Sequence, residues 1–427
     1  MEQIVSRENM TKAYVRVVRN KGSSGVDGLK IPELKGYLQA NWSTIKASLL
    51  AGRYQPQAVK KVKIPKPGGG ERILGIPTVL DRLIQQGIHQ VLSPLYDPGF
   101  SERSYGFRPG RNAQEAVKAA RDHIRSGKRW AIDMDLSKFF DEVNHERLLS
   151  KLRVMIKDRR VIHLIDRYLR AGMLENGVVE QRSKGTPQGS PLSPLLSNIV
   201  LDELDKELER RGHRFVRYAD DFQIYVGSKR SAERVMKSLT DFIEKRLKLK
   251  VNKEKSAIDR PWKRSFLGYS FTNQKETKLK VSKESIKRFR NKVKEQLRRG
   301  RGRNLERFVK EDLNPLLRGW LAYFSASEVK GFTRELDGWI RRHLRKVKWR
   351  QLKRPWTRRA ALMARGLSEE TAVRSTFNQR GAWWNAGARH MNAAYPNSYF
   401  DKMGLESLRK RHRQYHLYII AKNRRDT

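Results

Sequence analysis

One short stretch near the middle of the chain constrains its fold more than any other. In residues Phe215–Val226, strand-forming side chains flank the pair Asp220-Asp221 on both sides. Aspartate favours turns, whereas Val, Ile, Phe and Tyr favour extended strands. The stretch therefore predicts a hairpin of two antiparallel strands that presents two carboxylates at its turn.

A second strand-like segment, Trp130–Leu136, carries two more aspartates about 85 residues before the hairpin turn. Asp133 and Asp135 are two positions apart, so both lie on the same face of the strand, and their spacing does not choose between them. An ordinary polar turn is the alternative explanation of the hairpin aspartates. It does not explain a second acid-bearing strand, nor acids in so apolar a setting, where uncompensated charge is costly.

Carboxylates on adjacent, rigid backbone are what nucleotidyl transfer requires of a protein. Two divalent ions activate the attacking hydroxyl and stabilise the leaving pyrophosphate. Hard cations such as Mg²⁺ prefer oxygen ligands, and substrate phosphates fill part of each coordination sphere, so two or three aspartates suffice. We therefore expect two Mg²⁺ ions between the strand 130–136 and the turn at 220–221.

The charge of the chain points to a polyanionic partner. Its formal net charge is +47, from 92 Lys and Arg against 45 Asp and Glu, and a long nucleic acid is the polyanion that best absorbs such an excess. An anionic membrane is the competing partner, but the basic residues run along the whole chain and no lipidation signal is present. We expect no membrane association and a cytoplasmic ribonucleoprotein. The absence of cysteine excludes disulfides, thiol catalysis and Cys-ligated zinc.

The remaining pattern mixes a few strands with intervening helices, which is typical of an α+β fold. Residues 60–76 alternate apolar and basic side chains around a Gly-rich turn and predict a second hairpin. Helices are expected at 146–170, 194–211 and 231–247.

The character of the chain changes near residue 280. Lys283–Arg299 and Leu313–Phe324 repeat apolar side chains at helical spacing. Residues 281–360 hold 25 Lys and Arg against 8 Asp and Glu, a net charge of +17. A solvated helix surface is the alternative, but such surfaces usually mix both signs. We therefore predict a basic, helical second domain.

Several ordered blocks carry a resemblance to a known family: Asn20–Gly22 with Val26–Gly28, Ile64–Gly69 with Arg72, Ser104–Pro109, Asp133–Asp141, Gly185–Pro194, Tyr218–Asp221, Val251–Lys255 and Phe266–Gly268. They resemble the successive blocks of reverse transcriptases. The first block, together with Leu313–Phe324, resembles more narrowly the group II intron-encoded reverse transcriptases, or maturases, whose thumb carries the second motif.

This resemblance implies a right-hand polymerase fold: fingers and a palm with an antiparallel sheet, then an α-helical thumb and a small basic C-terminal domain. The implied divisions are an N-terminal extension at 1–50, fingers and palm at 51–278, the thumb at 279–365, and a C-terminal segment at 366–427. That last segment corresponds either to a DNA-binding domain or to an elaboration of the thumb. Because the chain lacks cysteine, we expect the endonuclease-lacking type.

The resemblance also assigns the catalytic residues. It implies that Asp135, Asp220 and Asp221 are catalytic and hold the metal ions together with Leu136, which leaves Asp133 a structural role. The aromatic residue that guards the sugar maps to Phe140, which would crowd a ribose 2′-hydroxyl. One of the adjacent pair Phe139 and Phe140 is expected in the core, and the other at the nucleotide.

Further contacts follow from the same resemblance. Lys66 and Arg72 map to fingers residues that hold the incoming triphosphate, although solvated hairpin charges are the alternative. Gln188 and Gly189 map beneath the templating pair, where a small residue lets the backbone approach the nucleotide, and Arg108 maps to a contact with template or triphosphate. The predicted nucleic-acid contacts are Gly189, Tyr218, Lys255, Lys287, Arg290 and Arg318.

The implied function is RNA-directed DNA synthesis from dNTPs on an intron RNA template. The implied partners are intron RNA, primer DNA and target DNA, and the implied roles are splicing and intron mobility, with priming from a nascent strand or an existing nick. Two alternatives remain: a maturase that assists splicing without polymerising, and a reverse transcriptase of a defence or diversity-generating system. The intact aspartates argue against the first, and the thumb motif argues against the second.

Overall fold

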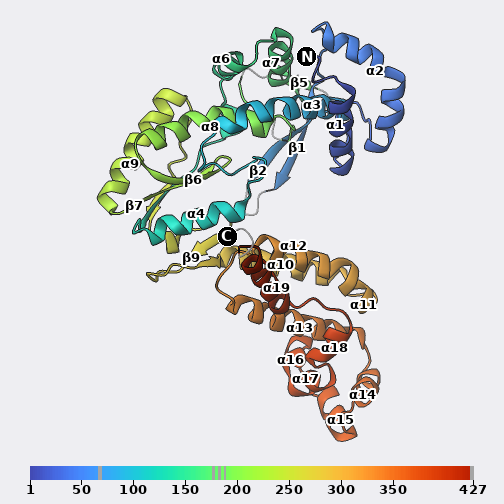
Figure 1. The fold of residues 1–427 in the computed structure, drawn as a ribbon. Coiled ribbons are helices and arrows are strands. Elements are labelled where there is room, and N and C mark those ends of the chain that lie inside the picture. The colour runs from blue at the N-terminus through green and yellow to red at the C-terminus, as the bar shows by residue number, and fades with distance from the viewer. Residues whose placement is uncertain (66–69, 176–177, 181–183, 187–188, 424–427) are drawn as a thin grey trace. The chain divides into compact units, whose positions relative to one another are not determined.

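The computed structural model describes residues 1–65, 70–175, 178–180, 184–186 and 189–423 (Figure 1). The chain divides into two compact units, Met1–Arg260 and Pro261–Thr427. The mixture of helices and small sheets confirms the predicted α+β class. Within the described ranges, none of the helices combines the length and the apolar character needed to span a bilayer.

The first unit holds two four-stranded sheets. One has the order β6-β7-β3-β8, with every neighbouring pair antiparallel. The other has the order β2-β1-β4-β5. The strands of the first sheet are β3 (Trp130–Met134), β6 (Arg214–Tyr218), β7 (Asp221–Val226) and β8 (Ala257–Asp259), and those of the second are β1 (Val59–Pro65), β2 (Glu71–Ile76), β4 (Met173–Glu175) and β5 (Val178–Glu180).

The hairpin predicted around the aspartate pair is confirmed as β6 and β7. Tyr218 pairs with Asp221, so Ala219 and Asp220 form a two-residue turn. Ala219 has φ of 58°, a left-handed conformation that a non-glycine residue rarely adopts. The predicted hairpin at 60–76 is confirmed as β1 and β2, and most of its turn lies outside the described residues.

Helices surround these sheets. α4 packs against β6 and β7, and α9 packs against β3, β7 and β8 (Figure 1). α4 begins with a capping box in which the Asn112 side chain accepts from the Glu115 N–H while Glu115 reaches back to Asn112. The helices of this unit are α1 (Arg7–Arg19), α2 (Leu34–Leu50), α3 (Val79–Tyr96), α4 (Ala113–Arg125), α5 (Phe139–Glu142), α6 (His145–Met155), α7 (Arg159–Arg170), α8 (Ser193–Arg210) and α9 (Lys229–Phe242).

Two helix predictions need correction in their bounds. The helical range expected at 146–170 is divided into two helices, α6 and α7. Ile156 is extended after α6, and the Asp158 side chain then caps α7 by accepting from the Arg160 N–H at 2.9 Å. The helix expected at 231–247 is α9 followed by a π-helical turn, Ile243–Leu247. The helix expected at 194–211 is confirmed as α8.

The second unit is mainly helical, as predicted, with one two-stranded antiparallel sheet. Its strands are β9 (Tyr269–Phe271) and β10 (Leu279–Val281). Its helices are α10 (Lys283–Arg299), α11 (Leu305–Phe308), α12 (Asn314–Tyr323), α13 (Gly331–Gln351), α14 (Pro355–Met363), α15 (Glu369–Thr376), α16 (Ala382–Gly387), α17 (Arg389–Ala394), α18 (Asn397–Lys402) and α19 (Leu408–Asn423).

The predicted range of α10 is confirmed residue for residue. Ser282 caps the helix by accepting from the Ser285 N–H, and Phe289, Val293 and Leu297 are buried at helical spacing. Trp320 of α12 stacks on Phe289 with ring centroids 4.1 Å apart. The compact division after Arg260 places β9 and β10 with the second unit, whereas the predicted domain boundary lies at 278.

Candidate active site

Strand pairing brings the predicted carboxylates together. β3 pairs antiparallel with β7, with Asp133 opposite Gln223 and Met134 opposite Phe222. Beyond that last pair lie Asp135, directly after the end of β3, and Asp221, the first residue of β7. The strand pairing therefore brings Asp133 and Asp135 toward the end of β7 that carries Asp221.

The charge of these carboxylates is concentrated in one place. Asp221 reaches solvent, yet protein atoms displace most of the water around it. Burial first, and then the negative charges of Asp133, Asp220 and Asp135, raise the pKa of Asp221 to about 7. Lys255, a predicted nucleic-acid contact, lies with its Nζ 4.0 Å from Asp135 Oδ2, and both side chains are largely exposed. Exposed pairs contribute little, so the site favours an additional cation.

The donor set fits Mg²⁺ in its chemistry. Carboxylate oxygens are the ligands that this cation prefers, and mutual repulsion among acids is what a divalent ion relieves. Across the residues that the structure describes, no three acidic or imidazole side chains already stand as a ready-made metal cage. Leu136, the fourth residue predicted to hold the metal ions, is buried next to Asp135. Its backbone forms an isolated antiparallel β-bridge with Val251.

A buried arginine, which was not predicted from the sequence, holds the backbone of the turn between β6 and β7. Arg217 is fully buried and donates Nε and Nη2 to the Asp205 carboxylate at 2.7 and 2.5 Å. Its Nη1 donates to the Ala219 carbonyl and to Asn198 Oδ1, each at 2.9 Å. The feature of the sequence that points to Arg217 is its charge within a run of strand-forming residues. The network fixes the backbone of the turn that carries Asp220.

Gly106 packs directly against the same turn. A Cβ atom at Gly106 would lie 2.3 Å from the Ala219 N and 2.9 Å from the Tyr218 carbonyl carbon. Its own carbonyl accepts from Asn198 Nδ2 at 2.9 Å, which links it to the arginine network. The next residue, Phe107, lies with its ring centroid 6.3 Å from that of Tyr218. Only glycine allows this approach of two backbones.

Gly106→Ala is therefore expected to displace the turn. We predict at least about a tenfold loss of DNA synthesis and a loss of about 1–3 kcal/mol in unfolding free energy, as is typical of an inserted methyl group that meets rigid backbone. Primer extension and urea unfolding measure the two effects. Gly99→Ala is the matched control, because a Cβ there meets nothing within 4 Å. Equal effects of the two substitutions would contradict the steric argument.

A cavity of about 420 Å³ in the first unit collects residues predicted to touch the nucleotide. Phe140 and Gly189 both line it, together with Phe107, Leu74 and Arg82. Gly189 has φ of 113°, and a Cβ there would lie 3.1 Å from the Gly75 carbonyl oxygen. Arg82 was not singled out from the sequence, and it places a cation at this cavity.

The adjacent phenylalanines lie in different environments, as predicted. Phe139 is 2% exposed and belongs to the core, whereas Phe140 is half-buried and lines the cavity. The Phe140 carbonyl accepts from the Thr186 N–H at 2.6 Å, and the Val143 carbonyl accepts from the Gly185 N–H at 2.8 Å. The start of the 185–194 block thus holds the backbone of Phe140.

The position of Arg108 differs from its predicted contact with template or triphosphate. Its side chain is 3% exposed and pairs with Asp97 Oδ1 at 2.7 Å. It also donates to the carbonyls of Asp97, Ser101 and Ser104. Four of the five guanidinium N–H groups are thereby used inside the protein, and Arg108 holds its own loop together.

The other predicted residues have varied positions. Lys66 and Gln188 lie outside the described residues, and the backbone of Arg72 pairs with Ile64 in the β1–β2 hairpin. In the second unit, Lys287 is exposed on α10. Arg290 Nη2 lies 3.9 Å from Glu335 Oε2, and Arg318 Nη1 lies 3.4 Å from Glu406 Oε1.

Two family models match consecutive parts of the chain. The reverse transcriptase (RNA-dependent DNA polymerase) model matches residues 64–271. The group II intron maturase-specific domain matches residues 286–366. The first match contains the carboxylates and Phe140, and the second contains most of α10 together with all of α12 and α13.

Two known proteins are similar in sequence to this chain over more than half of its length. The chain is 32% identical to protein YkfC of Escherichia coli, over 60% of this chain and 77% of that protein. It is also 32% identical to the group II intron-encoded protein LtrA of Lactococcus lactis, over 65% of this chain and 57% of LtrA. Among solved structures, telomerase from Candida albicans is similar over 84% of this chain and 69% of that chain, at 14% identity and a TM-score of 0.44.

That TM-score is below 0.5, so the assignment rests on the sequence matches. They confirm the resemblance drawn from the ordered blocks and from the thumb motif, and with it the fold of a reverse transcriptase domain followed by a maturase domain. The chain therefore belongs to the family of group II intron reverse transcriptases and maturases.

Proposed function

We propose that this chain is an RNA-directed DNA polymerase that copies a group II intron RNA and binds that RNA during splicing. The observation that carries the proposal is the pairing of β3 with β7, which gathers acidic side chains so that the charges of Asp133, Asp220 and Asp135 all act on Asp221. The family supports the template and the RNA partner. Because the chain spans 57% of LtrA, the activity, substrates and partners of the whole protein are proposed here rather than transferred.

Asp135, Asp220 and Asp221, together with Leu136, would hold the metal ions. Two Mg²⁺ ions, when bound, would activate the primer 3′-hydroxyl and stabilise the charge on the leaving pyrophosphate. The protein's own contribution is to hold Asp221 in β7, Asp135 directly after β3, and Asp220 in the turn whose backbone Arg217 contacts. Such a rigid arrangement of charge avoids reorganisation during the reaction.

Cations around the nucleotide cavity would hold the triphosphate. Arg82 lines the cavity together with Phe140, and burial is the first cause that lowers the pKa of Arg82. An anion next to a half-buried guanidinium compensates that burial. We include Arg82 with Lys66 and Arg72 as candidate phosphate contacts, and we place Gln188 and Gly189 beneath the templating pair. For the nucleic-acid strands we propose Tyr218, Lys255, Lys287, Arg290 and Arg318.

Primer extension on an RNA template with Mg²⁺ tests the activity directly. We expect extension by the intact chain and none by Asp220→Asn, which should still bind RNA with near-normal affinity because it changes only one charge among many. Filter binding or fluorescence anisotropy measures that affinity. Failure of the intact chain to extend any primed RNA would favour a maturase that assists splicing alone.

Phe140→Ala is expected to relax the discrimination against ribonucleotides. Removing the ring leaves room for a 2′-hydroxyl at the cavity, and we predict at least about a tenfold rise in relative ribonucleotide incorporation, equal to about 1.4 kcal/mol. Single-nucleotide extension with dNTP and rNTP measures the ratio. Phe140→Tyr keeps the ring and should keep the discrimination. An unchanged ratio in Phe140→Ala would remove Phe140 from the sugar contact.

A further inference from the structure

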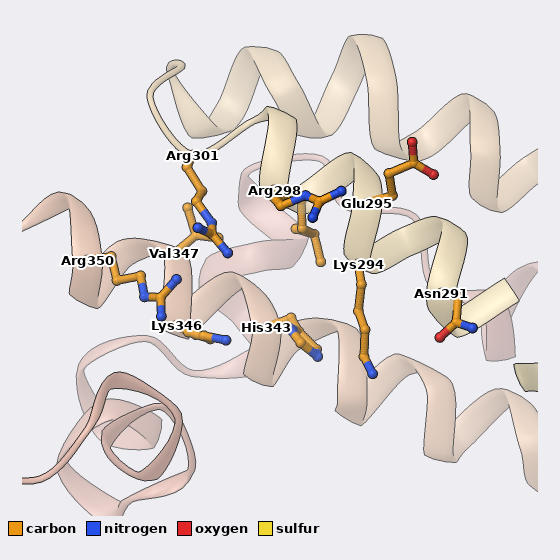
Figure 2. Close-up of a pocket in the computed structure, with 10 residues that line it drawn as sticks. Asn291, Lys294, Glu295, Arg298, Arg301, His343, Lys346, Val347 and Arg350 are labelled. Carbon is orange, nitrogen blue, oxygen red and sulfur yellow. The ribbon is translucent and has the colours of Figure 1, made fainter. Parts of the chain in front are cut away.

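The second unit contains a cavity of about 540 Å³ between α10 and α13. Figure 2 shows Lys294 and Arg298 on α10, and His343, Lys346 and Arg350 on α13, around one space. Arg301, in the loop that follows α10, extends toward the same space. Five permanent cations therefore surround one cavity.

These five cations are Lys294, Arg298, Arg301, Lys346 and Arg350. Within the described part of the chain, none of the five forms an ion pair with a carboxylate, although arginines beside them on the same helix do. The one acid that lines the cavity is Glu295, and its Oε1 lies 2.5 Å from Nη2 of Arg299, which does not line it. The lining thus carries five positive charges and one negative charge that is already paired.

Burial and neighbouring cations lower the pKa of two side chains that line the cavity, His343 and Lys346. The pKa of His343 is lowered to about 4, first by burial and then by Lys346, Lys294 and Arg342. Burial also lowers the pKa of Lys346, and Arg350, Arg301 and Lys294 lower it further. The imidazole is therefore neutral at pH 7. A site arranged in this way gains from any anion that enters it.

The spacing of the cations restricts the kind of anion. Lys294 and Arg298 are four residues apart on α10, and Lys346 and Arg350 are four residues apart on α13, so each pair spans about 5–6 Å. A single phosphate carries at most about two negative charges at neutral pH and engages part of such a set. Linked phosphates place three or four negative charges within one small volume. The cavity is within the range of about 300–1,000 Å³ that is typical of small-ligand sites.

We propose that this cavity binds a compact oligophosphate of three or more linked phosphates, as carried by a nucleoside triphosphate or by the 5′ end of a primary transcript. Arginine supplies paired donors to phosphate oxygens, and lysine supplies a point charge. The site lies in a different compact unit from the carboxylates, and it goes beyond the polymerase function proposed above.

The first test uses inorganic tripolyphosphate and the full chain in buffer without Mg²⁺. Isothermal titration calorimetry at constant ionic strength should show tripolyphosphate binding at least about tenfold tighter than orthophosphate, since tripolyphosphate forms additional charge-assisted hydrogen bonds with the cations of the cavity. Lys294→Gln/Lys346→Gln should weaken tripolyphosphate at least about tenfold. The control is Lys292→Gln/Lys348→Gln, which removes the same charge from the same two helices outside the cavity lining, and it should change affinity less than about threefold.

A second variant guards against a folding defect. Lys294→Gln/Arg298→Gln changes only exposed side chains of α10, and it should also weaken tripolyphosphate while keeping the melting temperature. The proposal is overturned if orthophosphate binds as well as tripolyphosphate, or if the control pair weakens binding as much as the cavity pairs. Asp220→Asn should bind tripolyphosphate normally, so a failure of the polymerase proposal and a failure of this one are separable.

The two sources of the oligophosphate are then compared directly. RNAs of one sequence with a 5′-triphosphate or a 5′-hydroxyl are titrated against the intact chain and the cavity pairs. A preference for the triphosphate end that disappears in Lys294→Gln/Lys346→Gln assigns the cavity to an RNA end. Cavity-dependent binding of ATP without such a preference assigns it to a free nucleotide. If neither ligand depends on the cavity pairs, the oligophosphate assignment is wrong.

Discussion

Asp221→Asn is expected to abolish DNA synthesis and, in the absence of metal, to stabilise the protein. Loss of one of the proposed metal-binding carboxylates should reduce synthesis by at least about a thousandfold, equal to about 4 kcal/mol of transition-state stabilisation. The stability effect has the opposite sign because the pKa of Asp221 is raised from 3.8 to about 7 by burial and by its three acidic neighbours.

The direction of the pH dependence follows from proton binding. Between about pH 4 and pH 7 the folded chain holds a proton on Asp221 that the unfolded chain has lost, so stability falls as pH rises through this window. Asparagine does not titrate. Asp221→Asn should therefore remove the part of the loss in stability that comes from deprotonation of Asp221. Above pH 7, metal-free Asp221→Asn should therefore melt at a higher temperature than the unsubstituted chain, and Mg²⁺ should stabilise only the latter.

Thermal unfolding in EDTA at pH 5 to pH 8, together with primer extension, measures both effects. Asp241→Asn is the matched control, since Asp241 is exposed on α9 and lies 3.5 Å from Lys245. It should leave synthesis and the pH profile unchanged. Residual synthesis by Asp221→Asn would contradict the metal assignment, and an unchanged pH profile would contradict the electrostatic one.

Arg217→Met is expected to lower the unfolding free energy by about 3–5 kcal/mol, because it leaves Asp205 buried without its partner. Burial already raises the pKa of Asp205, and Arg217 is the main influence that lowers it. Urea unfolding at pH 7 measures the loss. Lys229→Met is the control: it breaks an exposed pair with Glu233 at 3.7 Å and should cost less than about 1 kcal/mol.

A double substitution separates stability from activity. Arg217→Met/Asp205→Leu removes both charges and should regain much of the lost stability, as replacement of buried ion pairs by apolar residues often does. Synthesis should stay at least about tenfold reduced, because the Ala219 carbonyl and Asn198 still lack their donor. Full recovery of synthesis would show that Arg217 only compensates Asp205 and does not position the turn.

The elements that the sequence predicted well are those formed by local pattern. α10 has apolar side chains at regular helical spacing and a serine cap at its first turn, so its whole range could be read directly. The hairpin of β6 and β7 has strand-forming residues on both sides of two turn-forming aspartates. In both cases the residues that determine the element lie close together in the sequence.

Other elements depend on partners that are distant in sequence. β4, β5 and β8 are three residues long, too short to show a period, and they exist because a neighbouring strand pairs with them. Arg108 looks like a surface cation in the sequence, and only the fold reveals the carbonyls that surround it.

The sequence by itself determined the family and the hairpin of β6 and β7, and it predicted the acids of the site, because these follow from residue type and order. The tertiary structure determined which of these residues lie close together in space. The pairing of β3 with β7 brings Asp135 near Asp221, the contact of Gly106 with Ala219 fixes the turn, and the meeting of α10 with α13 gathers cations into one cavity. Each depends on which segments meet in space, and pairwise packing energies between distant residues leave no periodic signal in the chain.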